Sequence, residues 1–170
     1  MADMIRVGWV LVAVVALAGC GTTAAEPEAA PVVPAVQQAE PCELVSQELL
    51  DRHGLEKSSD NRGVNGRNCV WNSDSNFSLM VLIGWDRAAQ TDFHQLFPDP
   101  AGEVVIAQVK VVVSKSRLNP SCGTMFVAEQ GTVVEVAAGY AAPAPVNAAC
   151  AQAKAAMAVA IEKLRQQQML

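Results

Sequence analysis

Residues 147–164 read NAACAQAKAAMAVAIEKL and predict the longest helix of the chain. Apolar side chains recur in this stretch at intervals of three and four residues, which places them on one face of an α-helix. Asn147 has a side chain suited to the N-cap of this helix. A helix with one apolar face needs a partner surface that buries it. The apolar stripe consists of Cys150, Ala153, Met157, Ile161 and Leu164.

Strand-like segments before this helix predict the partner surface. They are rich in β-branched and apolar residues and are separated by turn-forming residues, as in an antiparallel sheet. Gln130 and Gly131 form a short hairpin signal between the last two segments. The third segment could be one long strand or two pieces bent near Ala107. The segments are 69–72, 77–85, 104–114, 122–129 and 132–138.

Shorter helices are expected at two further places. Ser46 can cap a helix over residues 47–53, and Gly54 can end it in the left-handed conformation. A second short helix is expected over residues 87–97. Residues 56–68 are polar and rich in Gly and Asn, which predicts a loop. We therefore predict an α+β fold with an antiparallel sheet of about five strands. A short N-terminal helix and a long C-terminal helix pack on this sheet.

The first 19 residues have the pattern of an export signal. Arg6 precedes an uncharged apolar stretch that ends in small residues, and this stretch is too short for a membrane span of roughly 20 residues. Leu17, Ala18, Gly19 and Cys20 together resemble a bacterial lipobox. This resemblance implies cleavage before Cys20 and a diacylglycerol on its sulfur, with acyl chains such as palmitate. Two acyl chains are enough for stable anchoring.

The sequence divides into three parts after this pattern is recognised. Residues 1–19 are the expected lipoprotein signal peptide. Residues 20–41 hold the lipidated Cys20 and a Pro/Ala-rich tether, a composition that favours extended chain. Residues 42–170 have a globular composition and are expected to form a single extracytoplasmic α+β domain.

Composition excludes several classes of function. The 170 residues carry 17 Asp and Glu against 12 Lys and Arg, a net charge of −5. An acidic chain of this kind is poorly suited to electrostatic capture of nucleic acid, so no nucleic-acid partner is expected. Apolar residues make up 51% of the chain, which excludes disorder throughout.

Four cysteines remain in the predicted domain once Cys20 is assigned to the anchor. An even number in an exported domain predicts two disulfides, and four cysteines allow three connectivities. We favour Cys42–Cys69 and Cys122–Cys150, because each pairing joins the start of a helix to the start of a strand. None of the four is spaced as C-x-x-C, so a redox site or a thiolate zinc site is not indicated.

The cysteine pattern also resembles a known family. The motifs are Pro41-Cys42-Glu43-Leu44-Val45 before a helix and Cys69-Val70-Trp71 at a strand start, with Cys122 before a hairpin and Cys150 opening the last helix. Over roughly residues 41–167 the chain resembles an uncharacterised domain-of-unknown-function family of actinobacterial lipoproteins with P-C-x-L-L and C-x-W motifs. Val45 replaces the commoner leucine. The resemblance implies a cell-envelope lipoprotein and supplies no catalytic residues.

No group of residues stands out as a catalytic, metal or cofactor site. Asn72, Asp74 and Asn76 alternate like calcium ligands, but Phe77 replaces the required glycine, so a hairpin turn is the better interpretation. The sequence contains no serine elbow, phosphate loop or H-E-x-x-H motif.

A few residues remain as weaker candidates for a site. Trp71 and Trp85 could face a ligand, although packing beside the disulfide is the stronger interpretation for Trp71. The two histidines could contribute to a dispersed site only together with nearby carboxylates. The histidines are His53 and His94, and the carboxylates nearest to them in the sequence are Asp51 and Asp92.

We therefore expect a lipid-anchored, non-catalytic binding or partner-interaction module on the extracytoplasmic face of the cell membrane. Its partner would be an envelope protein or a small ligand, and no cofactor or metal is expected. One alternative is a lipid or small-ligand carrier, with a cavity between the sheet and the terminal helix. The other is a hydrolase with a site assembled from dispersed residues.

Overall fold

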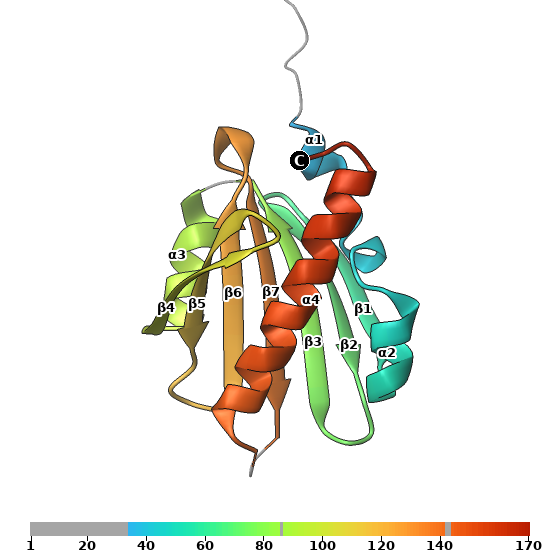
Figure 1. Cartoon of the computed structure of the whole chain (residues 1–170), viewed down its shortest axis with the longest axis vertical. Coiled ribbons are helices and arrows are strands. Elements are labelled where there is room, and N and C mark those ends of the chain that lie inside the picture. Colours follow the sequence, from blue (N-terminus) through green and yellow to red (C-terminus); the bar gives the residue numbers. More distant parts are fainter. Residues whose placement is uncertain (1–33, 86, 142–143) are drawn as a thin grey trace, which may run out of the picture. The chain divides into compact units, whose positions relative to one another are not determined.

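The computed structural model describes residues 34–85, 87–141 and 144–170, excluding the side chains of Arg87 and Ala88. Within these residues, seven antiparallel strands form one sheet in the order β1-β2-β3-β7-β6-β5-β4 (Figure 1). The strands are β1 (Glu56–Gly63), β2 (Gly66–Asn72), β3 (Phe77–Gly84), β4 (Asp99–Ile106), β5 (Val109–Lys115), β6 (Ser121–Val127) and β7 (Val133–Tyr140). The helices are α1 (Ala35–Gln38), α2 (Gln47–His53), α3 (Arg87–Leu96) and α4 (Val146–Gln166), with the 3-10 turns η1 (Pro41–Glu43) and η2 (Glu129–Gly131). The prediction of about five strands is therefore wrong.

The first unpredicted strand is β1, which lies in the segment predicted as a loop. It pairs with β2 from Glu56 opposite Asn72 to Gly63 opposite Gly66, with one irregularity on the way. Seven of its eight residues are exposed, because β1 is an edge strand whose faces are largely open to solvent. An edge strand in this position needs no apolar alternation and its polar side chains oppose edge-to-edge association. The polar composition of residues 56–68 is therefore compatible with both an edge strand and a loop, and the prediction of a loop is wrong for residues 56–63.

The second difference lies in the segment 104–114, for which one strand or two pieces remained open. The chain forms two strands, β4 and β5, which pair from Asp99 opposite Lys115 to Ile106 opposite Val109. Ala107 and Gln108 connect them with φ angles of 45° and 62°. Two central residues with positive φ are typical of the tight hairpin turns whose twist matches that of the strands. The bend expected near Ala107 is thus a complete reversal.

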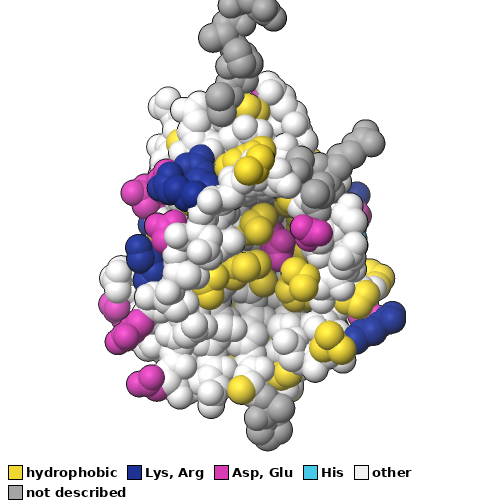
Figure 2. All heavy atoms as spheres, turned by 180° about the vertical axis from the view of Figure 1, so that it is seen from behind, with side chains coloured by type: hydrophobic (Ala, Val, Ile, Leu, Met, Phe, Trp, Pro, Cys, Tyr) yellow, Lys and Arg dark blue, Asp and Glu magenta, His cyan; other side chains and the backbone are white. Residues whose placement is uncertain are grey.

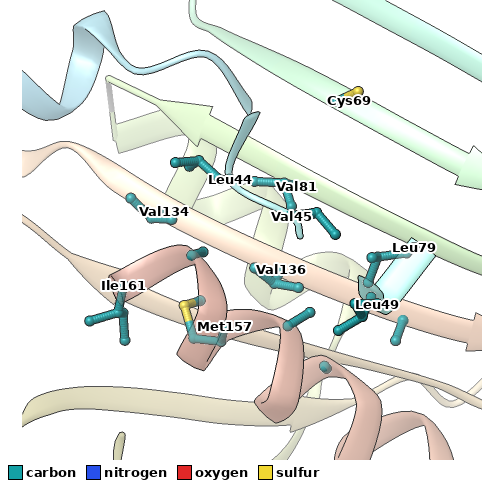
Figure 3. Close-up of a cluster of buried hydrophobic side chains, with 14 of the residues drawn as sticks. Leu44, Val45, Leu49, Cys69, Leu79, Val81, Val134, Val136, Met157 and Ile161 are labelled. Carbon is teal, nitrogen blue, oxygen red and sulfur yellow. The ribbon is translucent and has the colours of Figure 1, made fainter. Parts of the chain in front are cut away.

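Helix α4 covers one face of the sheet and buries the predicted stripe. Its small side chains let it approach closely, since Ala149, Ala153, Ala156 and Ala160 are fully buried. Figure 3 shows Met157 and Ile161 of this helix beside side chains of β3, β7 and the N-terminal segment. The residues of β3 and β7 that belong to the same core cluster as α4 are Phe77, Leu79, Val81 and Ile83 of β3, and Val134, Val136 and Ala138 of β7.

Helix α4 begins two residues earlier than a cap at Asn147 would place it. Its N-cap is Pro145, which makes no side-chain capping bond, and Asn147 lies inside the first turn. The prediction that Asn147 caps the helix is therefore wrong. Instead, the side-chain oxygen of Asn147 accepts a hydrogen bond of 3.3 Å from Lys115 Nζ on β5.

Helix α2 has the bounds and the caps predicted for it. The backbone N–H of Leu49 donates to Ser46 Oγ at 3.3 Å, and Gly54 ends the helix with a φ of 58°. These two residues satisfy backbone groups that a seven-residue helix would otherwise leave open at its ends.

Residues 34–41, which belong to the predicted tether, pack on this unit. Val36 and Ala39 are buried, and the side chain of Glu40 accepts hydrogen bonds from Arg62 and Arg67 of the β1–β2 hairpin. Gln37 donates to Thr132 Oγ1 at 3.1 Å. The compact unit therefore includes residues that precede Cys42.

Both favoured disulfides are present, which confirms the prediction of two bonds. Cys42 and Cys69 have Cα atoms 5.1 Å apart, and Cys122 and Cys150 have Cα atoms 4.9 Å apart. One bond ties η1 to β2, and the other ties the start of α4 to β6. In the chain-entropy model, loops of this length stabilise a domain by roughly 3–4 kcal/mol each.

Candidate functional site on the uncovered face of the sheet

Helix α3 packs on the face of the sheet opposite α4 and lies near the predicted position. Phe93 and Phe97 are buried and contact β6 at Gly123, where an added Cβ would lie 2.7 Å from both rings. Glycine is needed there because any side chain would push the helix away. The other residues buried under α3 belong to β6 and β7, so the helix covers that half of the face.

None of the helices in the described part of the chain lies over the β2–β3 half of the same face. Val70 of β2 and Met80 and Leu82 of β3 lie on this face and are half-buried, whereas the residues of β3 that face α4 are buried. Figure 2 shows apolar side chains gathered over the centre of this face, with acidic side chains among them and a hollow beneath. An exposed apolar patch with polar groups inside it is typical of a binding surface.

A groove of about 540 Å³ occupies one end of this face. It lies beside the β2–β3 turn, where the Ala141 N–H donates to the carbonyl of Asn76. The chain enters the described unit at the other end, where residues 34–36 lie beside 168–170 (Figure 1). We call this the distal groove. Its lining residues are Val70, Asn72, Ser73, Asn76, Phe77, Ser78, Leu79, Met80, Asn119, Ser121, Ala137, Ala138, Gly139, Tyr140 and Ala141.

The described residues that line the distal groove include no charged side chain. Its floor is apolar, and its polar groups are hydroxyls and carboxamides, which can both donate and accept hydrogen bonds. Such a surface suits an uncharged ligand that has hydroxyl or amide groups and an apolar side.

A second hollow, of about 400 Å³, lies between the β1–β2 hairpin and α3. We call it the hairpin hollow. Asp92 and Ala89 of α3 form one wall and Leu82 of β3 contributes to it. The remaining lining residues come from the hairpin and are Asn61, Arg62, Gly63, Val64, Asn65, Gly66 and Asn68.

Glu135 lies in the middle of β7 on the same face as the two hollows. It stands opposite Leu82 on one side and Met125 on the other, and only 2% of its surface is exposed. Its Oε1 has no hydrogen-bond partner among the described residues. Burial, together with the nearby carboxylate of Asp92, raises the pKa of Glu135 to about 7.

Sequence reasoning missed Glu135, although the strand VVEVAAGY carries a signal for it. A carboxylate between valines in a central strand lies either on a solvent-open face of the sheet or in the core. In the core it destabilises the fold unless it has a hydrogen-bond or ion-pair partner. Unpartnered buried carboxyl groups are enriched at functional sites, which makes Glu135 the residue of greatest interest on this face.

The two tryptophans proposed as ligand-facing are not among the lining residues of either hollow. Trp71 is 2% exposed and belongs to the core under α4, in agreement with packing beside the Cys42–Cys69 bond. Trp85 is half-buried, its Nε1–H donates to the Val64 carbonyl at 2.7 Å, and the Arg67 guanidinium lies 5.7 Å from its ring. These contacts account for both indoles structurally.

Each histidine contacts the ring of a different phenylalanine, one in a tilted and the other in an edge-on arrangement. His53 lies 5.0 Å from the ring of Phe77, and His94 lies 5.5 Å from the ring of Phe93. In the described part of the chain, no three His, Cys, Asp or Glu side chains are grouped to hold a metal ion.

The alternating Asn72, Asp74 and Asn76 form a turn, as expected. The N–H of Ser73 donates to the Phe77 carbonyl, and the N–H of Phe77 donates to Ser73 Oγ. These bonds join β2 to β3 across the turn.

Comparison with models of known protein families finds one family that matches most of the chain. Residues 15–163 match the family described as "Protein of unknown function (DUF3558)". The chain belongs to the DUF3558 family. No curated protein and no solved structure matches it. The prediction of membership in a family of unknown function is confirmed, and the DUF3558 match includes every residue of both hollows.

The predicted signal peptide and Cys20 lie outside the described residues. Among the helices of the described part, none is both long and apolar enough to cross a membrane.

Proposed function

We propose that this DUF3558 protein is a lipid-anchored, non-catalytic binding module of the actinobacterial cell envelope. Cys20 carries the anchor on the extracytoplasmic face of the membrane, and the distal groove takes an uncharged envelope ligand. The observation that carries this proposal is the groove itself, of about 540 Å³ and lined by uncharged side chains.

The position of the groove supports a role in presentation. The chain enters the described unit near residues 34–36, whereas the groove lies at the opposite end of the sheet. A domain held through its N-terminal segment therefore offers the groove at the end remote from its attachment. Neutral hydroxyl-bearing molecules such as saccharides have the hydrogen-bonding groups and apolar faces that this lining suits.

The composition of the lining also favours binding over catalysis. General acid–base chemistry needs a titratable group near the reacting atoms, and nucleophilic serine needs an adjacent base. As far as the structure describes its lining, the groove contains serine hydroxyls but no histidine, carboxylate or lysine. The hydrolase alternative therefore has no support from this groove.

The carrier alternative required a cavity between the sheet and α4. In the described structure that space holds the fully buried Ala153, Ala156 and Ala160 against the sheet, which leaves no room for an acyl chain at these positions. The hollows described here lie on the other face.

The groove can be tested by native mass spectrometry of the protein extracted from envelopes, followed by titration with neutral methyl glycosides. We expect an adduct that is lost on denaturation. Ser78→Glu places a carboxylate in the groove and should abolish binding, whereas Ser75→Glu alters an exposed serine of the adjacent turn and should not. Equal binding by both variants, or a bare protein that takes up no glycoside, would contradict the proposal.

The anchor is tested separately by fractionation and by the mass of the N-terminal peptide. The wild-type peptide should begin at Cys20 and carry a diacylglycerol, and Cys20→Ala should lose the modification and leave the membrane fraction. Thr22→Ala is the matched control and should remain anchored. An unmodified Cys20 in membrane-bound protein would refute lipidation.

A further inference from the structure

We infer that Glu135 and Asp92 form a recognition site for an alkylammonium group that enters the hairpin hollow. This site is distinct from the distal groove and requires neither the lipid anchor nor the ligand of that groove.

The first observation is the unmet hydrogen bonding of Glu135. Its side chain is buried and Oε1 has no partner in the described part of the molecule. None of the ion pairs among the described residues includes Glu135 or Asp92. A buried carboxylate without a counter-charge is costly, and a bound cation would remove that cost.

The second observation is the hollow beside it. Asp92 and Leu82 line the hairpin hollow, and Glu135 lies behind this lining, directly opposite Leu82 across β3 and β7. Arg62 also contributes to the lining, but its guanidinium is paired with Glu40 at 2.7 Å. The acidic side chain of the lining is thus contributed by α3, and the cationic side chain, which comes from the hairpin, already has a carboxylate partner.

The walls favour an organic cation over a metal ion. Calcium takes six to eight oxygen ligands, and the described residues offer no cluster of three acidic or metal-binding side chains. An ammonium group has three N–H donors. The two carboxylates can accept two of these hydrogen bonds, and a side-chain amide oxygen of Asn61, Asn65 or Asn68 in the lining can accept the third. Leu82 and Ala89 provide apolar contact for the methylene stem, as apolar surfaces do for lysine side chains.

The test uses the full chain in an uncharged detergent, labelled with ¹³C in the methionine methyl groups and in the glutamate carboxyl groups. Met125 stands opposite Glu135 and reports on its surroundings. The probes are n-butylammonium chloride and N-acetyl-lysine N-methylamide, with n-butanol as the uncharged control. Binding of both probes identifies a site for alkylammonium groups in general, and binding of the lysine derivative alone identifies a lysine side chain of a protein partner.

At saturation we expect the proton affinity of Glu135 to fall about tenfold, since a nearby positive charge favours the carboxylate. The Met125 methyl signal should shift with the same concentration dependence. Asp92→Asn, which changes an exposed side chain, should weaken binding, and Glu135→Gln should abolish it. Glu129→Gln, in the exposed β6–β7 turn, should behave as wild type.

Three outcomes would overturn the inference. The first is an equal response to n-butanol, which would indicate simple apolar binding. The second is unchanged ammonium binding by folded Asp92→Asn and Glu135→Gln. The third is a response of Glu135 to calcium chloride with none to either amine, which would assign the site to a metal ion.

Discussion

Replacing Glu135 by Gln should remove most of the pH dependence that this residue gives to folding. The pKa of Glu135 rises from 4.5 to about 7 because the carboxyl group is buried and faces Asp92. The folded state therefore holds this proton more tightly than the unfolded state. As pH rises from about 4.5 through 7, the free energy of unfolding must fall, and above 7 the contribution stays constant.

The magnitude follows from the difference between the two pKa values. Each pKa unit corresponds to about 1.4 kcal/mol, so the carboxyl group destabilises the fully ionised folded state by about 3 kcal/mol. Between pH 5 and pH 8 the loss is about 2–3 kcal/mol, which is a large share of the stability of a small domain. Glutamine has nearly the same shape and cannot ionise, so its variant should lack this slope.

Urea unfolding of the oxidised protein at pH 5, 6, 7 and 8 measures the effect. We expect the stability of Glu135→Gln relative to wild type to increase by about 2–3 kcal/mol across this range. Glu129→Gln controls for the general effect of removing one acidic residue, because Glu129 is exposed. A difference between wild type and Glu135→Gln that stays constant from pH 5 to pH 8 would refute the reasoning.

Three further predictions concern stability and can be checked by thermal or urea unfolding. Ser46→Ala removes the hydrogen bond from the Leu49 N–H to the cap and should lower the free energy of unfolding by about 1 kcal/mol. Hydrogen exchange should show faster exchange of backbone amides in α2 only. Replacing both Cys122 and Cys150 by alanine should cost about 3–4 kcal/mol, and an unchanged midpoint would show that the bond adds nothing. Gly123→Ala places a Cβ 2.7 Å from the rings of Phe93 and Phe97 and should cost about 1–3 kcal/mol, whereas Gly63→Ala, whose Cβ would lie at an ordinary contact distance of 3.5 Å from the Gly66 carbonyl oxygen, should be neutral.

The parts of the fold predicted correctly are those that local chemistry determines. Helix α2 carries its caps in its own sequence, and α4 carries an apolar stripe of the correct period. The disulfide pairing was favoured for a reason that the structure supports, since each bond joins a helix or turn to a strand. The helix signals lie within a few residues of each other, and the number of disulfides follows from the even number of cysteines.

The missed features depend on neighbours that are remote in the chain. Strand β1 exists because β2 offers it a backbone partner, and no side chain of its exposed segment reports this. The hairpin at Ala107 and Gln108 lacks the Gly and Asn that usually mark such turns. The strand sequence could have drawn attention to Glu135, but the proximity of Asp92 to it depends on the packing of α3 against β6 and β7.

The Cys42–Cys69 bond also determines how the domain bears mechanical load. A pull on the N-terminal segment first meets α1 and η1, which are held by apolar packing and by the Glu40 ion pairs. These noncovalent contacts can break one after another. The load then reaches the Cys42–Cys69 disulfide, which is a covalent link to β2, an interior strand of the sheet. Tension through the N-terminus is thus passed into the sheet at β2 and bypasses α2 and the edge strand β1, so the core can remain folded while the first helix is stripped away.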